Sequence, residues 1–155
     1  MIRILLYKGK SITSRLIEWQ TRSPYSHAAI QLSDGRVVEA VGKYGVHVID
    51  DPRFGHAPGT EIDAYIYHQA VSAAAEYAAA KWLYQQLGKQ YDYRSVFRFM
   101  SRVPAAENDR WFCSELVAEF SDRLHIPLFN SRALSYNVSP RDVSMSAELV
   151  FWGSQ

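Results

Sequence analysis

The sequence predicts a single α+β domain with a mainly antiparallel sheet. The chain has 155 residues, which fits one domain, and no stretch rich in Pro, Gly or Ser divides residues 1–155. Strand-like apolar runs dominate the first half of the chain, whereas helical patterns lie mainly in the second half. This segregation of strands and helices along the sequence is typical of α+β domains.

The expected strands are short apolar runs that are bounded by turn residues or loops. They comprise residues 2–7, 26–32 and 36–41, the segment around Val46 and Val48, residues 62–67 and residues 148–152. Ser33-Asp34-Gly35 lies between the second and third runs, and this combination predicts a β-hairpin. A short helix is expected at about residues 12–19, directly after the first strand.

Two longer helices and one helical turn are also expected. The apolar residues within 71–82 follow helical spacing, and Gly88 is suited to ending that helix. A second apolar helical face runs through residues 113–124. Near the end of the chain, Ser139 and Pro140 fit the N-cap and first position of a helical turn.

Charge and cysteine content exclude several classes of protein. The 17 Lys and Arg residues balance 16 Asp and Glu residues, so we expect no nucleic-acid partner. A single cysteine excludes an internal disulfide and a cysteine-based zinc site. No apolar run reaches the roughly 7–15 residues of a secretory signal or the roughly 20 of a transmembrane segment. We therefore expect a protein that is cytoplasmic as synthesised and acts elsewhere only through a route without a signal peptide.

The histidines do not predict a metal site. No two of the five have the i, i+4 spacing of a helical zinc site. His56, His68 and His125 lie in a loop or at element ends, where a solvated or structural role is expected. His47 alternates with two valines, so it should lie on the sheet face opposite to them. We expect no metal and no other cofactor.

Cys113 has two interpretations. It shares an apolar helical face with residues such as Leu116 and Phe120, so it could be a buried packing residue. It also lies in the first turn of its helix, which Asn108 or Asp109 could cap. The partial positive charge of a helix N-terminus favours a thiolate, and the free N–H groups there can bind an oxyanion. This position is compatible with a catalytic nucleophile.

His27 is the best candidate for the base that such a thiol requires. Strand alternation places it on the less apolar face of residues 26–32, where we expect the helix of Cys113 to lie. Glu39, in the next strand, has apolar neighbours on its own face, and a buried carboxylate needs a partner. It is either an acid that orients His27 or a surface acid on an edge strand.

The length of the hairpin loop decides between these roles for Glu39. A two-residue turn at Asp34-Gly35 would place Glu39 on the face opposite to His27 and leave Gln31 as the candidate orienting residue. A three-residue loop with Gly35 in a left-handed conformation would pair Ala29 with Glu39. His27 and Glu39 would then be diagonal neighbours on one face, within side-chain reach.

Several segments together resemble a known superfamily. They are Ser26-His27-Ala28-Ala29-Ile30, Glu39 twelve residues after His27, and Trp111-Phe112-Cys113-Ser114-Glu115-Leu116-Val117. Residues 88–93 and 139–142 add weaker matches. The set resembles the circularly permuted papain-like hydrolases of the NlpC/P60 superfamily, in the YiiX/YaeF and lecithin:retinol acyltransferase-like branch. In this branch the histidine precedes the cysteine, as here.

The resemblance implies one permuted papain-like domain over residues 1–155, with a sheet packed against helices and the nucleophile at a helix N-terminus. It implies a Cys113, His27 and Glu39 triad, with Tyr91 and the Cys113 backbone N–H at the oxyanion site. The implied reaction is cleavage of a peptide amide, such as a bacterial cell-wall stem peptide, through a thioester. Two alternatives remain: an acyltransferase or lipid or thioester hydrolase with the same triad, and a non-catalytic binding module. The oligomeric state is not predicted.

Overall fold

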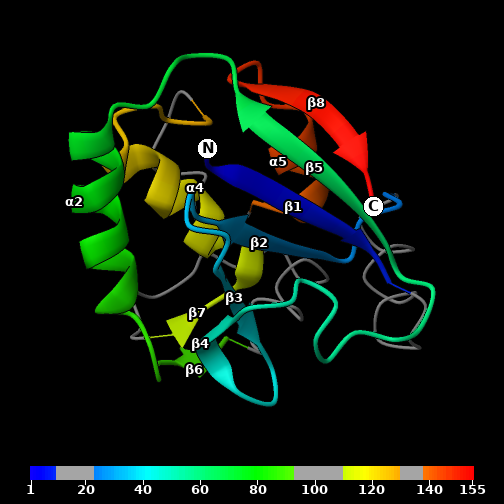
Figure 1. Cartoon of the computed structure of the whole chain (residues 1–155). Coiled ribbons are helices and arrows are strands. Elements are labelled where there is room, and N and C mark those ends of the chain that lie inside the picture. Colours follow the sequence, from blue (N-terminus) through cyan, green and yellow to red (C-terminus); the bar gives the residue numbers. More distant parts are fainter. Residues whose placement is uncertain (10–22, 93–109, 130–137) are drawn as a thin grey trace.

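The protein is described from a computed structural model over residues 1–9, 23–92, 110–129 and 138–155. Within these ranges, a six-stranded antiparallel sheet has the order β4-β3-β2-β1-β5-β8 (Figure 1). Its strands are β1 (Arg3–Lys8), β2 (His27–Gln31), β3 (Val37–Val41), β4 (Gly45–Ile49), β5 (Glu61–Tyr67) and β8 (Leu149–Ser154). Each expected strand is present within two residues of its expected ends. The helix expected at residues 12–19 lies outside the described residues.

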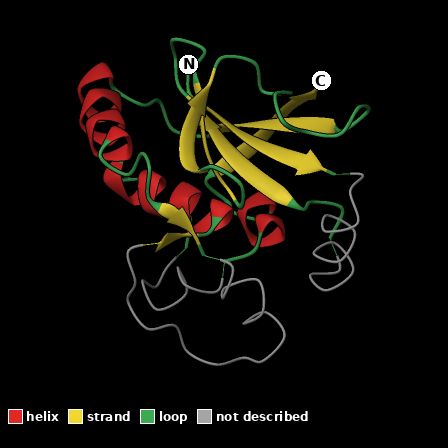
Figure 2. Cartoon of the chain, turned by 90° about the horizontal axis from the view of Figure 1, so that it is seen from below, coloured by secondary structure: helices red, strands yellow, loops and turns green. Residues whose placement is uncertain are grey.

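The two faces of the sheet differ in what covers them. The helices α2 (Ala73–Tyr84), α4 (Cys113–Arg123) and α5 (Pro140–Ser144) lie together on one side (Figure 2). There Ile4, Leu6 and Ile30 pack with α4 in the main apolar core. The opposite face has a smaller cluster that includes Tyr7, Ala29 and Val37. Because alternate residues of a strand face opposite ways, both clusters draw on the same strands.

Helix α4 begins at Cys113, as its apolar periodicity predicts. Its N-cap is Phe112, whose backbone N–H donates to the Glu115 carboxylate at 3.4 Å. The prediction that Asn108 or Asp109 caps the helix is therefore wrong, and both residues lie outside the described ranges. The carboxylate of Glu115 takes over the role of the cap because it reaches back from the first turn, where a negative charge is favourable.

The other helices also differ slightly from expectation at their ends. Ser139 caps α5 by accepting a hydrogen bond from the backbone N–H of Asp142 at 3.2 Å, as predicted. Helix α2 ends at Tyr84, with Gln85 as its C-cap, rather than next to Gly88, because the N–H groups of residues 85–87 donate to carbonyl oxygens three residues back. None of the helices in the described residues is long and apolar enough to cross a membrane.

A small parallel pair, β6 (Gln90–Tyr91) and β7 (Arg110–Trp111), leads into α4. Strands of two residues carry no periodicity, so the sequence did not predict them. The segment before β6 is tied to β4, because Val46 donates to the Lys89 carbonyl oxygen at 2.9 Å and Gly88 donates to the Val46 carbonyl oxygen at 2.9 Å. The β6–β7 pairing itself places Tyr91 opposite Trp111, two residues before the start of α4.

Candidate active site

The hairpin between β2 and β3 has a three-residue loop, which is the loop length that puts Glu39 and His27 on the same face. Leu32 donates to the Arg36 carbonyl oxygen at 2.9 Å, and Gly35 adopts a left-handed conformation with φ of 95°. Ala29 consequently pairs with Glu39. The hairpin thereby places Glu39 on the sheet face that carries His27.

His27 and Glu39 form a direct hydrogen bond on this face. The His27 Nε2 and Glu39 Oε2 atoms are 2.7 Å apart, and the Glu39 side chain is only 2% exposed. Burial raises the pKa of the Glu39 carboxyl, but the hydrogen bonds and charges of His27 and His56 lower it more strongly. The net pKa lies below the usual range, so Glu39 is a buried carboxylate held by its histidine partners.

Two further histidines contact the same carboxylate. His47 Nε2 lies 2.9 Å from Glu39 Oε1, and His56 Nε2 lies 3.3 Å from Glu39 Oε2. Alternation correctly predicted that His47 lies opposite the two valines of β4. That face is also the face of Glu39, because Glu39 and His47 are cross-strand partners in the β3–β4 hairpin. Their separation of eight residues around a short turn was the available sequence signal.

Tyr7 holds the loop that carries His56 against the sheet. Its ring stacks on the ring of His56 at a centroid distance of 4.2 Å, and its hydroxyl donates to the Pro52 carbonyl oxygen at 3.0 Å. Burial, followed by the charges of Glu39 and Asp51, raises the pKa of Tyr7. The phenol therefore remains a protonated donor, and His56 is positioned by a fixed neighbour although it belongs to a loop.

Cys113 interacts with His27 where α4 and β2 both begin, since each is the first residue of its element. Burial lowers the pKa of His27, but the charge and hydrogen bond of Cys113 and those of Glu39 raise it to about 10. A histidine that interacts with a cysteine on one side and a carboxylate on the other is the arrangement that activates a thiol in cysteine hydrolases. Cys113 is buried, and burial would also suit a packing residue, so the polar interaction with His27 is the distinguishing feature.

Helix α4 does not cover the sheet face on which His27 and Glu39 lie, which corrects the sequence-based expectation. Leu116 and Phe120 of α4 pack with Ile30, whose side chain points to the opposite face from His27. The apolar side of α4 packs against the apolar side of the strands because this contact removes hydrophobic surface from water on both elements. Cys113 therefore approaches His27 from the start of the helix and not from its side.

Tyr91 lies near the start of α4. It pairs with Trp111 across the β6–β7 ladder, and its ring is 5.8 Å from that of Phe112 between centroids. Asp92, the next residue, is buried and donates its backbone N–H to the Trp111 carbonyl oxygen at 3.1 Å. The structure thus positions Tyr91 within two residues of Cys113 along the paired strand.

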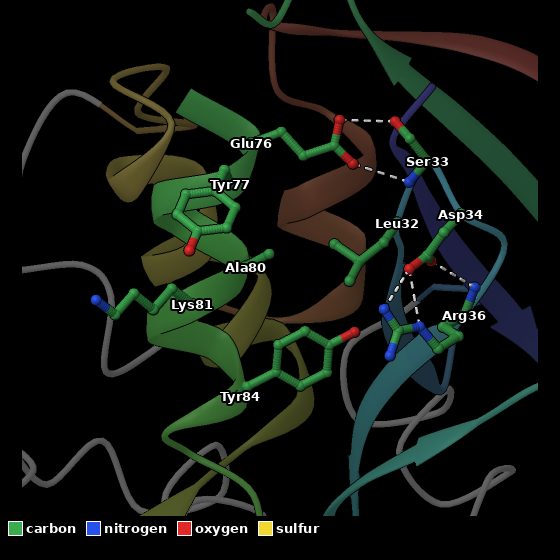
Figure 3. A pocket seen from close by; sticks show the side chains of 9 residues that line it. All are labelled: Leu32, Ser33, Asp34, Arg36, Glu76, Tyr77, Ala80, Lys81 and Tyr84. Atoms are coloured by element: carbon green, nitrogen blue, oxygen red, sulfur yellow. Dashed lines mark hydrogen bonds and ion pairs between the residues drawn. The ribbon is translucent and has the colours of Figure 1, made fainter. Parts of the chain in front are cut away.

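A separate pocket of about 490 Å³ lies between α2 and the β2–β3 hairpin (Figure 3). Glu76 closes one side, because its carboxylate accepts hydrogen bonds from the backbone N–H and the hydroxyl of Ser33 at 2.9 and 2.7 Å. Asp34 and Arg36 form an ion pair at its rim. Cys113 and the histidines around Glu39 do not line this pocket.

Comparison with known proteins places the chain in a family. A sequence profile described as permuted papain-like amidase enzyme, YaeF/YiiX, C92 family, matches residues 4–151. The fold is similar to the crystal structure of the metalloprotein YiiX from Escherichia coli O157:H7, with a TM-score of 0.75 and 20% identity over 99% of this chain and 96% of that chain. No curated protein sequence matches significantly. The α+β fold is therefore permuted papain-like, and the chain belongs to the C92 family of permuted papain-like amidases.

Proposed function

We propose that the protein is a cysteine amidase in which Cys113 is the nucleophile, His27 the acid–base and Glu39 the residue that orients His27. The observation that carries the proposal is the position of His27, which interacts with Cys113 on one side and with Glu39 at 2.7 Å on the other. Because Nε2 of His27 faces Glu39, Nδ1 is the ring nitrogen left for the thiol.

In the acylation step, the Cys113 thiolate attacks the carbonyl carbon of the substrate amide and forms a C–S bond. The carbonyl π electrons move to oxygen, and the oxyanion is bound by the Cys113 backbone N–H and by Tyr91. When the intermediate collapses, the C–N bond breaks, and His27 gives its Nδ1 proton to the leaving amine. The product of this step is a thioester on Cys113.

In the deacylation step, His27 takes a proton from water, which attacks the thioester carbonyl. The C–S bond breaks, the carboxylic acid leaves, and the thiolate–imidazolium pair is restored. Glu39 stays ionised throughout and stabilises the imidazolium by its charge and hydrogen bond. The low pKa of Glu39 supports this role.

For the substrate, we propose a peptide amide, with a bacterial cell-wall stem peptide as the first choice. The family description as amidases supports the amide class. An acyl lipid or thioester is the second choice, because the same thioester intermediate can pass its acyl group to water or to another acceptor. A non-catalytic binding module is the remaining alternative, and the buried position of Cys113 would suit it.

Intact-mass measurement of the acyl-enzyme tests the proposal. The protein is mixed with separate pools of cell-wall fragments, other peptides and acyl lipids, and the reaction is quenched in acid. A peptidyl mass increment on Cys113 is the expected result, whereas a fatty-acyl increment would identify the acyltransferase alternative. Cys113→Ser serves as the control for the site of modification.

The same measurement on variants tests the roles of the other residues. His27→Ala should suppress the adduct because the thiol loses its base, and Glu39→Gln should slow its formation less because the amide oxygen still accepts a hydrogen bond. If no pool modifies Cys113, and Cys113→Ala binds a pool component as tightly as the wild type, the protein is a binding module and the amidase proposal is wrong.

A further inference from the structure

Three side chains of the site have the composition and spacing of a transition-metal site. One ligand atom from each of His27, Glu39 and His56 lies within 4.8 Å of the other two. We propose that these three residues bind a zinc ion, and that zinc binding reversibly switches off the thiol enzyme. The regulatory half of this inference rests on the proposed amidase function, whereas the zinc site itself does not.

Two of the three distances between ligand atoms are close to those around a zinc ion. Ligand atoms at about 2.0–2.1 Å from a tetrahedral zinc are about 3.3–3.4 Å apart. His56 Nε2 and Glu39 Oε2 are already 3.3 Å apart, and His27 Nε2 and Glu39 Oε2 are 2.7 Å apart. The ligand nitrogens of His27 and His56 lie within 4.8 Å of each other. Zinc binding therefore requires the His27–Glu39 contact to open and the two imidazoles to approach the ion at about 3.4 Å from each other.

The residues around the cluster already orient its ligands. His47 Nε2 binds the other oxygen of the Glu39 carboxylate, Oε1, at 2.9 Å, which leaves Oε2 directed at His27 and His56. Tyr7 stacks on the His56 ring at 4.2 Å and restricts its rotation. Outer contacts of this kind fix the direction of metal ligands and raise the affinity of a site.

The ligand set selects the kind of metal. Two imidazoles and one carboxylate with a fourth position open is a common zinc arrangement, whereas magnesium and calcium prefer oxygen ligands alone. A carboxylate ligand also supplies one of the two negative charges that balance the ion. We therefore expect binding of zinc and no comparable binding of magnesium.

Zinc and thiol catalysis compete for the same imidazole, because zinc binds Nε2 of His27 and the thiol uses Nδ1. When Nε2 is bound to the metal, the remaining nitrogen, Nδ1, carries the ring proton and has no lone pair with which to take the proton of Cys113. Glu39 is occupied by the metal at the same time and no longer supports an imidazolium. The metal-bound protein thus keeps its nucleophile but loses its base.

Zinc titration of the metal-free protein tests the site without any substrate. The protein competes for Zn²⁺ with a chromophoric chelator, and one zinc per chain is expected. His56→Ala should weaken binding by tenfold or more, because one of three ligands is lost. His68→Ala is the matched control, because His68 is an exposed histidine outside the cluster, and its affinity should not change. Magnesium should not displace zinc.

Cys113→Ser separates this site from simple binding of zinc to a thiolate. We expect this variant to bind zinc as the wild type does. If Cys113→Ser abolishes zinc binding, or if His56→Ala binds as tightly as the wild type, the proposed site is wrong. His56→Gln provides a second ligand deletion that keeps a polar side chain next to Glu39, and circular dichroism establishes that each variant is folded.

The rate of acylation of Cys113, with and without zinc, tests the regulatory half. Each variant is compared with its own metal-free rate, so changes in basal activity do not enter the comparison. Zinc should slow acylation of the wild type at least tenfold, a chelator should restore the rate, and His56→Ala should be less sensitive. If acylation continues unchanged with zinc bound, the proposal that zinc switches off the enzyme is wrong.

If no substrate acylates Cys113, the amidase proposal fails. The alkylation rate of Cys113 with and without zinc then tests whether zinc binding changes the reactivity of the thiol.

Discussion

The imidazole of His27 lies 2.7 Å from the carboxylate of Glu39, although the two residues belong to different strands and are twelve positions apart. Their contact depends on the number of residues in the β2–β3 loop, because one residue fewer would turn Glu39 to the other face of the sheet. Gly35, with φ of 95°, is the residue that permits the three-residue loop. The geometry of the site is therefore linked to a glycine that lies outside it.

Alanine substitutions at two glycines should separate backbone strain from steric overlap. Gly35 and Gly45 both have positive φ, but an added Cβ at Gly35 meets nothing within 4 Å, whereas one at Gly45 would lie 2.2 Å from the Lys89 carbonyl oxygen. Gly35→Ala should cost about 1–2 kcal/mol of unfolding free energy. Gly45→Ala should cost about 1–3 kcal/mol more, because β4 must move away from the segment before β6.

Urea unfolding of the two variants measures these costs. Gly153→Ala is the control, because Gly153 has no positive φ and an added Cβ would meet nothing within 4 Å. Its effect should stay within about 0.5 kcal/mol. Equal losses at Gly35 and Gly45 would contradict the close approach of β4 to Lys89.

Cys113 should react with iodoacetamide faster at pH 6 in the folded protein than in the urea-unfolded protein. The reason is the charge interaction and hydrogen bond between His27 and Cys113, which exist in the folded state only. His27→Ala should slow the folded-state reaction by about ten- to a hundredfold. Peptide mass mapping after timed quenching measures the rate. A thiol that reacts only after unfolding would identify Cys113 as a packing residue.

Substitutions of Glu39 should lower the free energy of unfolding, and they should lower it more when they leave its three histidine partners without an acceptor. Glu39→Ala removes the partner of His27, His47 and His56, and breaking such a buried pair costs about 3–5 kcal/mol. Glu39→Gln keeps the shape and one acceptor oxygen, so its cost should be smaller. Thermal and urea unfolding compare the two variants, and a Gln variant that is less stable than the Ala variant would contradict this account.

The pH dependence of stability should have a maximum between about pH 4.5 and 6.5. The pKa of His27 rises on folding from 6.5 to about 10, because Cys113 and Glu39 outweigh the opposing effect of burial. Its contribution is complete below pH 6.5 and is lost as the pH rises toward 10. The pKa of Glu39 falls on folding from 4.5, because its histidine partners outweigh burial. Its contribution is complete above pH 4.5 and is lost at lower pH.

Urea unfolding midpoints from pH 3 to pH 10 measure this dependence. Cys113→Ser should flatten the alkaline side of the profile, because the serine hydroxyl carries no charge and His27 then keeps only Glu39 as its anionic partner. The acid side should remain as in the wild type. An alkaline slope that is unchanged in Cys113→Ser would show that the thiolate contributes nothing to the charge state of His27.

The sequence by itself determined the local features of the protein. Short apolar runs bounded by turn residues located the strands, helical spacing located α4, and the pair Ser139 and Pro140 located α5, because these signals depend on neighbouring residues. The parity of the hairpin with a left-handed Gly35 predicted that His27 and Glu39 share a face. The motif around Cys113 indicated the family.

Only the tertiary structure decided which distant segments meet. The β3–β4 register placed His47 against Glu39, and the packing of Tyr7 brought His56 from its loop to the same carboxylate. No periodicity encodes such contacts, because they depend on how a loop folds back over the sheet. The face that α4 covers was also decided there, since the apolar side of α4 packs against the strand residues of the main core.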